Sequence, residues 1–242
     1  MNFVDQGVFI AVGMALSLFG GGGAIILIPY LKAGLGMPLD QAALLSVVTI
    51  GINTGVQSAI DRRSIQWKAV VSFSLIAFPA VALSGRYLAP VVPDQIRMIC
   101  FGVFTLSVAA LMFFPFKPHQ GETRNRKGFA ASAAATGVLC GLIGVGGGIF
   151  IAPALSLFYR IPIKEAVKSS LAIVAVQSFT ALVTYLGRGV RVDFSFSLQM
   201  LVMVGIGVVV GRRLKGLIPD KQLKRLFAFF LIGIGSWVIV RP

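Results

Sequence analysis

Two runs of glycine interrupt apolar segments of this chain, and they occupy the same place in two copies of one longer pattern. With Pro29 placed on Pro153, a spacing of 124 residues, FGGGGAIILIPYLKAGLGMP aligns with IGVGGGIFIAPALSLFYRIP, and Asn53 falls on Gln177. Internal duplication is typical of polytopic membrane proteins whose two halves enclose a site between them. We therefore expect two related halves, each built around one glycine turn.

The composition indicates that these segments belong in a bilayer. Of the 242 residues, 57% are hydrophobic and 12% are charged, and the mean hydropathy is +0.90. A soluble core of this size could not hide so much apolar surface, so the sequence predicts an all-α polytopic membrane protein in contact with lipids. The formal net charge of +14 does not indicate nucleic-acid binding, because Lys and Arg collect on the cytoplasmic loops of membrane proteins.

Each half contains five apolar pieces, of which two are short. In the first half the pieces are 6–19, 24–33, 39–60, 67–89 and 95–116. At about 1.5 Å per residue, the last three reach about 33 Å or more, enough for a hydrocarbon core of roughly 30 Å. The first two reach only about 21 and 15 Å, so we interpret them as half-helices joined by the glycines. The expected fold is two repeats, each with a glycine-broken pair of half-helices and three transmembrane helices.

The positions of the basic residues indicate how each short pair lies in the membrane. If the pair enters and returns as a hairpin, 16 of the 22 Lys and Arg residues fall on one side and 6 on the other; if it crosses once, they divide 10 to 12. Only the hairpin agrees with the positive-inside rule. Both termini would then face outside, and residues 1–116 and 128–242 would be inverted repeats joined by a cytoplasmic linker, residues 117–127. Two short passes in place of each hairpin give the same parity and stay open.

The glycine turns are candidates for a substrate site. Irregular backbone at membrane depth is tolerated only where protein or a water-filled cavity satisfies its polar groups. A half-helix begins after each turn, so two helix N-termini with unpaired N–H groups would point toward the middle of the protein and favour an anion. The glycines concerned are Gly20, Gly21, Gly22 and Gly23 in the first half and Gly144, Gly146, Gly147 and Gly148 in the second. The alternative, that glycine only permits close helix packing, is our interpretation of Gly207 and Gly211.

Uncharged polar residues follow each turn at helical spacing. Candidate substrate-binding residues are Ser46, Thr49, Asn53 and Gln57 in the first half and Ser169, Ser170 and Gln177 in the second. The first four are spaced by 3, 4 and 4 residues, which keeps them on one narrow helix face. Neutral donors suit an oxyanion because they supply hydrogen bonds without holding it in a salt bridge. Hydrogen bonding between helices is the alternative for each of them.

Residues with reactive side chains are sparse. All eight Asp and Glu residues lie at segment ends or in loops, Cys100 and Cys140 have no metal-ligand spacing, and His119, the single histidine, lies in the linker. We therefore expect no metal, no cofactor and no enzymatic site. A proton or cation relay built on a buried carboxylate is not expected either. An interior-negative membrane potential favours the exit of an anion by about 2.3 kcal/mol per charge per 100 mV, which indicates export.

These motifs resemble those of a known family. The repeated turns GGGGAIILIP and GVGGGIFIAP, the segment SSLAIV, and the segment ends DRRSIQW and GRGVRVDF are similar to the sulfite exporter TauE/SafE family, also called toluene sulfonate uptake permeases. The similarity covers nearly the whole chain and both repeats. It implies a transporter of sulfite, sulfonates or related sulfur anions in the bacterial inner membrane, with the glycines of both turns forming the substrate site and Asn53 and Gln177 nearby.

Two classes of function agree with the sequence. A secondary transporter of a small sulfur-containing anion, with its site between the repeats, accounts for the duplication and the paired half-helices, and an anion channel would use the same chemistry. An intramembrane enzyme or a scaffold for a partner complex is the alternative from another class. The sequence does not determine the oligomeric state, and a homo-oligomer agrees with it.

Overall fold

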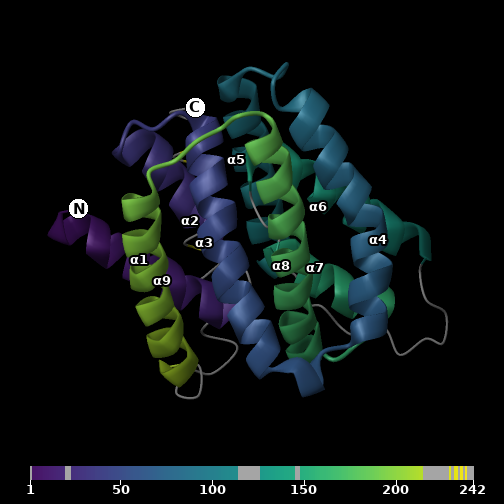
Figure 1. The fold of residues 1–242 in the computed structure, drawn as a ribbon. Coiled ribbons are helices and arrows are strands. Elements are labelled where there is room, and N and C mark those ends of the chain that lie inside the picture. The colour runs from purple at the N-terminus through teal and green to yellow at the C-terminus, as the bar shows by residue number, and fades with distance from the viewer. Residues whose placement is uncertain are drawn as a thin grey trace.

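The computed structural model describes residues 2–19, 23–113, 126–144 and 148–214, together with residues 229, 232–233, 235–236 and 238. Figure 1 shows this part of the chain as a bundle of helices, and no strand occurs among the described residues. The first half contains α1 (Phe3–Phe19), α2 (Gly23–Pro29), η1 (Tyr30–Gly34), α3 (Leu39–Ile60), η2 (Arg62–Ser64), α4 (Trp67–Leu83), η3 (Ser84–Leu88) and α5 (Asp94–Phe113). The second half contains α6 (Arg126–Ile143), α7 (Gly148–Ala154), η4 (Leu155–Tyr159), α8 (Ile163–Gly187) and α9 (Phe194–Leu214). The elements η1, η3 and η4 are π-helical turns, and η2 is a short 3₁₀ turn.

The helices agree closely with the segments expected from hydropathy. The piece expected at 39–60 is α3, and the piece expected at 67–89 is α4 with η3. Four described helical stretches are long and apolar enough to cross a membrane: Leu39–Ile60, Trp67–Leu88, Glu165–Gly187 and Phe194–Leu214. The prediction of an all-α polytopic membrane protein is confirmed. Residues 117–125 of the expected linker, including His119, lie outside the described residues.

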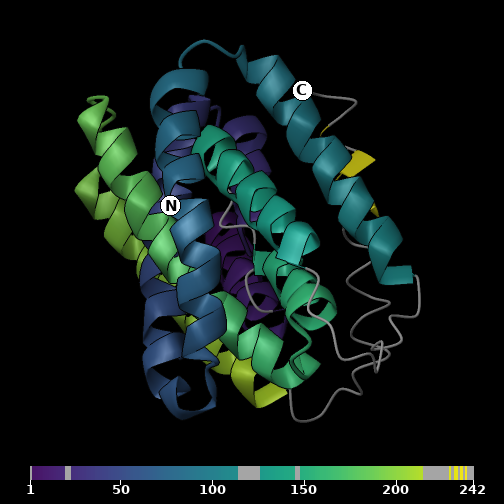
Figure 2. The same ribbon diagram turned by 90° about the vertical axis from the view of Figure 1, so that its right-hand side faces the viewer.

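Helices α3 and α8 lie side by side at the centre of the bundle (Figure 1). Helix α1 packs along α9, and α6 packs along α4. The duplication in the sequence aligns α1 with α6 and α4 with α9. The pair of α1 with α9 in one part of the bundle therefore corresponds to the pair of α6 with α4 in the other. Helix α5 lies at the edge of the bundle, beside α6 (Figure 2). This packing is the kind that two related halves would produce, and the repeat itself stays a prediction.

Ion pairs show that α3 and α8 run in opposite directions. Asp40, in the first turn of α3, pairs with Arg188, which follows the end of α8; Nη2 lies 2.6 Å from Oδ2. Asp61, which follows the end of α3, has its Oδ1 4.0 Å from Nζ of Lys168, near the start of α8. We call these two ends of the bundle the Asp40 end and the Asp61 end. Opposite directions in two corresponding helices are what inverted repeats require.

Repeat-related prolines set the starts of the two central helices. Pro38 and Pro162 precede α3 and α8, and both have φ −54° and ψ 141°. Because a proline biases the residue before it away from helical conformation, neither helix extends further toward its N-terminus. The proline carbonyls accept the first helical bonds, from the N–H of Ala42 at 3.0 Å and of Ala166 at 2.9 Å. Both halves therefore begin the central helix in the same way.

Glycines allow the outer helices α1 and α9 to approach to backbone contact. A Cβ atom on Gly13 of α1 would lie 2.0 Å from the carbonyl oxygen of Val204 in α9. A Cβ on Gly207 would lie 2.1 Å from the carbonyl oxygen of Ile10, and one on Gly211 would meet the α1 backbone at 2.9 Å. Small residues have this role at helix interfaces in membranes. The interpretation of Gly207 and Gly211 as packing residues is confirmed.

Replacing Gly13 by alanine should destabilise the protein, because the added Cβ meets the α9 backbone rather than a movable side chain. Overpacking of this kind costs about 1–3 kcal/mol, so the unfolding temperature of the purified protein in detergent should fall by several degrees. Gly7 of the same helix provides the control, because a Cβ there has nothing within 4 Å. Gly7→Ala should leave the unfolding temperature unchanged or raise it, and equal losses in the two variants would contradict close packing of α1 on α9.

Candidate functional site

Each glycine-broken pair of short helices folds back on itself. In the first half, the Tyr30 hydroxyl, just after α2, donates to Oδ1 of Asp5 in the first turn of α1 at 2.6 Å. In the second half, the ring centroid of Tyr159, at the end of η4, lies 5.2 Å from that of Phe129, near the start of α6. The chain thus returns, in both halves, toward the start of the helix that precedes the turn. This is hairpin geometry rather than one broken helix that continues in a single direction.

The second glycine turn lies against the beginning of α3. Gly144 has φ +79°, which residues with a side chain rarely adopt, and a Cβ there would lie 2.7 Å from the Cβ of Ala43. Glycine is thus required both by the backbone and by the approach of α3. Ser46 follows Ala43 by about one helical turn, so this predicted residue lies on α3 close to the level of Gly144. Gly20, Gly21, Gly22, Gly146 and Gly147 lie outside the described residues, and Gly23 and Gly148 are buried at the starts of α2 and α7.

The polar residues expected to bind substrate are buried on the two central helices. Those on α3 are Ser46, Thr49, Asn53 and Gln57, and those on α8 are Ser169, Ser170 and Gln177. The helices touch near their middles, because a Cβ on Gly51 would lie 2.8 Å from the Cβ of Ser178. Asn53 and Gln177 are close to these contact residues in sequence. The two repeat-related amides therefore lie at about the same level of the bundle.

The candidate residues extend along the helices rather than around one point. From Ser46 to Gln57, α3 rises about 16 Å, which is longer than a small oxyanion is wide. Because α3 and α8 are antiparallel, Ser46 lies toward the Asp40 end and Ser170 toward the Asp61 end, with Asn53 between them. We call these seven candidate residues, together with Ser178 of α8, the polar path. The structure thus distributes the predicted site residues along a path between the two ends.

Polar atoms on this path have no hydrogen-bond partner in the described part of the chain. They are Ser46 Oγ, Thr49 Oγ1, Gln57 Nε2, Ser178 Oγ, and both Oε1 and Nε2 of Gln177. A buried polar atom without a partner costs about 1–3 kcal/mol, so such atoms are rare unless water or a ligand completes their bonds. Thr54, on the same helix, differs, because its Oγ1 donates to the carbonyl oxygen of Ile50 at 2.7 Å. The unpartnered atoms are therefore the strongest feature of the candidate site.

Three of the predicted residues have partners within the protein. Asn53 Nδ2 donates to Thr49 O at 2.9 Å, Ser170 Oγ donates to Val167 O at 2.8 Å, and Ser169 Oγ accepts from the N–H of Gln66 at 3.0 Å. The last bond satisfies a backbone donor at the start of α4, which α4 itself cannot satisfy. Ser169 therefore joins α8 to α4 at the Asp61 end, a role that sequence spacing does not reveal.

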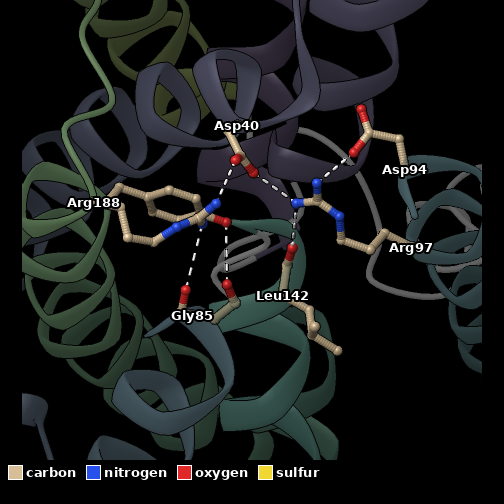
Figure 3. A network of polar contacts seen from close by, with 8 residues as sticks. Asp40, Gly85, Asp94, Arg97, Leu142 and Arg188 are labelled. Atoms are coloured by element: carbon tan, nitrogen blue, oxygen red, sulfur yellow. Dashed lines mark hydrogen bonds and ion pairs between the residues drawn. The ribbon is translucent and has the colours of Figure 1, made fainter. Parts of the chain in front are cut away.

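Sequence spacing also gives no sign of an ionic cluster at the Asp40 end. Figure 3 shows Asp40 between two arginines: Nη1 of Arg97 lies 2.7 Å from Oδ1, and Nη2 of Arg188 lies 2.6 Å from Oδ2. Arg97 also pairs with Asp94 and donates to the carbonyl oxygen of Leu142 at 3.3 Å, two residues before the Gly144 turn. Asp40 is 57 residues from Arg97 and 148 from Arg188, so no local motif marks the cluster.

Comparison with known proteins agrees with these features. The model of the family described as sulfite exporter TauE/SafE matches residues 7–238. A probable membrane transporter protein of Xylella fastidiosa is 29% identical, with 95% of this chain and 92% of that protein covered. The probable membrane transporter protein YunE of Bacillus subtilis is 25% identical, with 99% and 98% covered, and no solved structure gives a significant match. The chain therefore belongs to the sulfite exporter TauE/SafE family of membrane transporters.

Proposed function

We propose that this protein is a secondary transporter that exports a small sulfur-containing anion, such as sulfite or a sulfonate, along the polar path on α3 and α8. The observation that carries the proposal is the set of buried, unpartnered polar atoms on that path. A bound oxyanion would accept hydrogen bonds from Ser46, Thr49 and Gln177 without meeting a fixed charge, so it would not be trapped. The backbone amides of the two glycine turns belong to the same proposed path.

The packing of the helices supports a carrier with alternating access. Antiparallel α3 and α8 and the matching outer pairs fit two inverted repeats, residues 1–116 and 128–242, with the substrate at their interface. In such transporters one repeat rocks against the other, and the site opens to each side in turn. A channel is the second candidate, and it would need both ends open at once. The ion pairs of Asp40 with Arg97 and Arg188 favour the carrier, because they hold one end together.

The charges near the path support export of an anion. In the described part of the chain, the acidic residues lie within a turn of a helix end or in a connection: Asp5, Asp40, Asp61, Asp94, Glu165 and Asp193. None of them lies in the middle of α3 or α8, where a carboxylate could bind a coupling proton or cation. An interior-negative membrane potential alone then drives an anion outward, by about 2.3 kcal/mol per charge per 100 mV.

The family of the chain supports a sulfur anion as the substrate and transport as the function. The family is described as a sulfite exporter, which supports sulfite or a related anion as the substrate. The relatives are named membrane transporters, which favours transport over an intramembrane enzyme or a scaffold.

We place the protein in the bacterial inner membrane with the Asp61 end in the cytoplasm. Arg62 and Arg63 follow Asp61 directly, and Lys168 and Arg212 approach it from α8 and α9. The positive-inside rule assigns such a basic end to the cytoplasm. The linker, residues 117–127, would then be cytoplasmic, and both termini would face outside.

Transport should depend on the unpartnered hydroxyl of Thr49 and not on the partnered hydroxyl of Thr54. Thr49→Val keeps the shape of the side chain but removes a donor to a charged substrate, so sulfite flux in proteoliposomes should fall by about tenfold or more. The same variant should unfold at an equal or higher temperature, because a buried hydroxyl without a partner is removed. Thr54→Val is the matched control and should keep its flux. Saturable sulfite flux that is equal in wild type and Thr49→Val would contradict the proposed path.

The orientation is tested by labelling single cysteines from one side. Cys140 is buried, so Cys100→Ser provides a background without an exposed thiol. Ser64→Cys at the Asp61 end should react with a membrane-impermeant maleimide only after the membrane is opened, whereas Gln95→Cys at the Asp40 end should react in intact cells. Both positions are exposed, so the accessibility of the protein surface does not differ between them. The reverse pattern of labelling would overturn the assigned orientation.

A further inference from the structure

Two arginines, Arg97 buried and Arg188 partly buried, converge on the carboxylate of Asp40, and Arg97 also pairs with Asp94. The side chain of Arg97 is 5% exposed and that of Arg188 is 12% exposed, and each donates to a different oxygen of Asp40. Figure 3 shows the carboxylate held between the two guanidinium groups. Paired charge-assisted bonds from arginines are also how proteins hold small free oxyanions. We call Arg97 and Arg188 the arginine site.

Further contacts fix the arginines where they stand and leave one donor unused. Nη1 of Arg188 donates to the carbonyl oxygen of Gly85 at 3.4 Å, and Nη1 of Arg97 donates to that of Leu142 at 3.3 Å. Nε of Arg97 is buried and has no partner in the part of the chain that the structure describes. The arginine site therefore has more donor capacity than the single carboxylate of Asp40 uses.

The arginine site lies next to the proposed path. Leu142 is two residues from Gly144, and Gly144 is in contact with Ala43, one turn along α3 from Asp40. An anion that moves from the Gly144 turn toward the Asp40 end would thus come to the two guanidinium groups next. At that point Asp40 already occupies the position that the anion would take.

The opposite end of α3 provides a contrast within the same molecule. Asp61 also lies between two cations, but Nζ of Lys168 is 4.0 Å away and Nη2 of Arg212 is 3.5 Å away. Those side chains are 36% and 34% exposed, and a surface hollow of about 460 Å³ lined by residues 59–64 lies beside Asp61. Partly exposed pairs at such distances contribute little binding energy. The two carboxylates are similarly exposed, but the pairs at the Asp40 end are shorter and their arginines are more buried.

We propose that the arginine site is a second oxyanion site, in which the carboxylate of Asp40 takes the place of the transported anion until that anion displaces it. The identity of the anion, a small sulfur oxyanion, rests on the proposed function. When substrate is absent, Asp40 pairs with both arginines, of which Arg97 also pairs with Asp94, and keeps α3, α5 and α8 joined at this end. When the anion binds, it takes the bonds of Asp40, which releases α3. Competition by Asp40 also keeps the anion from binding too tightly to leave.

The test removes the carboxylate of Asp40 and supplies a free one. Asp40→Ala should lower the unfolding temperature of the purified protein in detergent, because Arg188 loses its carboxylate partner and Arg97 keeps only Asp94. Sodium formate supplies a free carboxylate. At millimolar concentration, sodium formate and sodium sulfite should each raise the unfolding temperature of this variant by roughly 2–4 °C or more. Sodium chloride at equal ionic strength should not. Asp61→Ala is the matched control and should show no selective effect of formate or sulfite, because its cations lie farther from the carboxylate and are more exposed.

Two further variants separate loss of the anion site from loss of folding. Asp40→Ser retains one hydroxyl acceptor and should show the same response to formate if Asp40→Ala cannot be purified. Adding Arg188→Gln to either variant should abolish the response. If formate and sulfite act no better than chloride in both Asp40 variants, or act equally in Asp61→Ala, the second oxyanion site is refuted. Wild-type proteoliposomes without flux of any oxyanion would instead refute the proposed function, and the response to formate would stand.

Discussion

Backbone groups inside a bilayer must find hydrogen-bond partners within the protein, and this requirement governs the whole arrangement. In each half the first helix ends beside a run of glycines, at Phe19 or at Ile143, and the chain then folds back, as the contacts of Tyr30 with Asp5 and of Tyr159 with Phe129 show. Such a return needs cover from other helices. In the second half α3 supplies it, because Gly144 lies directly on Ala43. The close pairs of α1 with α9 and of α6 with α4 flank the central helices.

Glycine has two separate roles in this architecture, and only one concerns the candidate site. At Gly13 and Gly207 it allows neighbouring helices to touch along their backbones, which contributes stability. At Gly144 it also permits a backbone angle that other residues rarely adopt. The polar path has the opposite effect on stability, because unpartnered atoms such as Gln177 Nε2 remain buried. Unsatisfied groups of this kind are expected where a protein keeps donors available for a ligand.

Much of the fold could be predicted from the sequence because its signals are local. Hydropathy predicted the helix at 39–60, which the structure gives as Leu39–Ile60, and helical spacing placed Thr49 and Gln57 on a buried face. The basic residues favoured a hairpin, and the contact of Tyr30 with Asp5 has that geometry. What could not be predicted depends on how distant segments meet. The basic residues predicted inverted repeats and with them opposite directions for α3 and α8, but spacing along one helix does not show that these two helices are in contact, which the approach of Gly51 to Ser178 shows. The pairing of Asp40 with arginines far away in sequence, and the bond of Ser169 to the start of α4, have no local signal.

The polar residues of α3 and α8 are proposed to bind an oxyanion, and a crystal structure can locate that anion. Selenite has the shape of sulfite and contains an atom with strong anomalous scattering. A crystal grown with selenite should show a selenium peak within hydrogen-bond distance of Thr49 or Gln177. Selenium found only beside exposed residues such as Arg62, or a structure in which Thr49 and Gln177 are bonded to other protein groups with no room for an anion, would contradict the account.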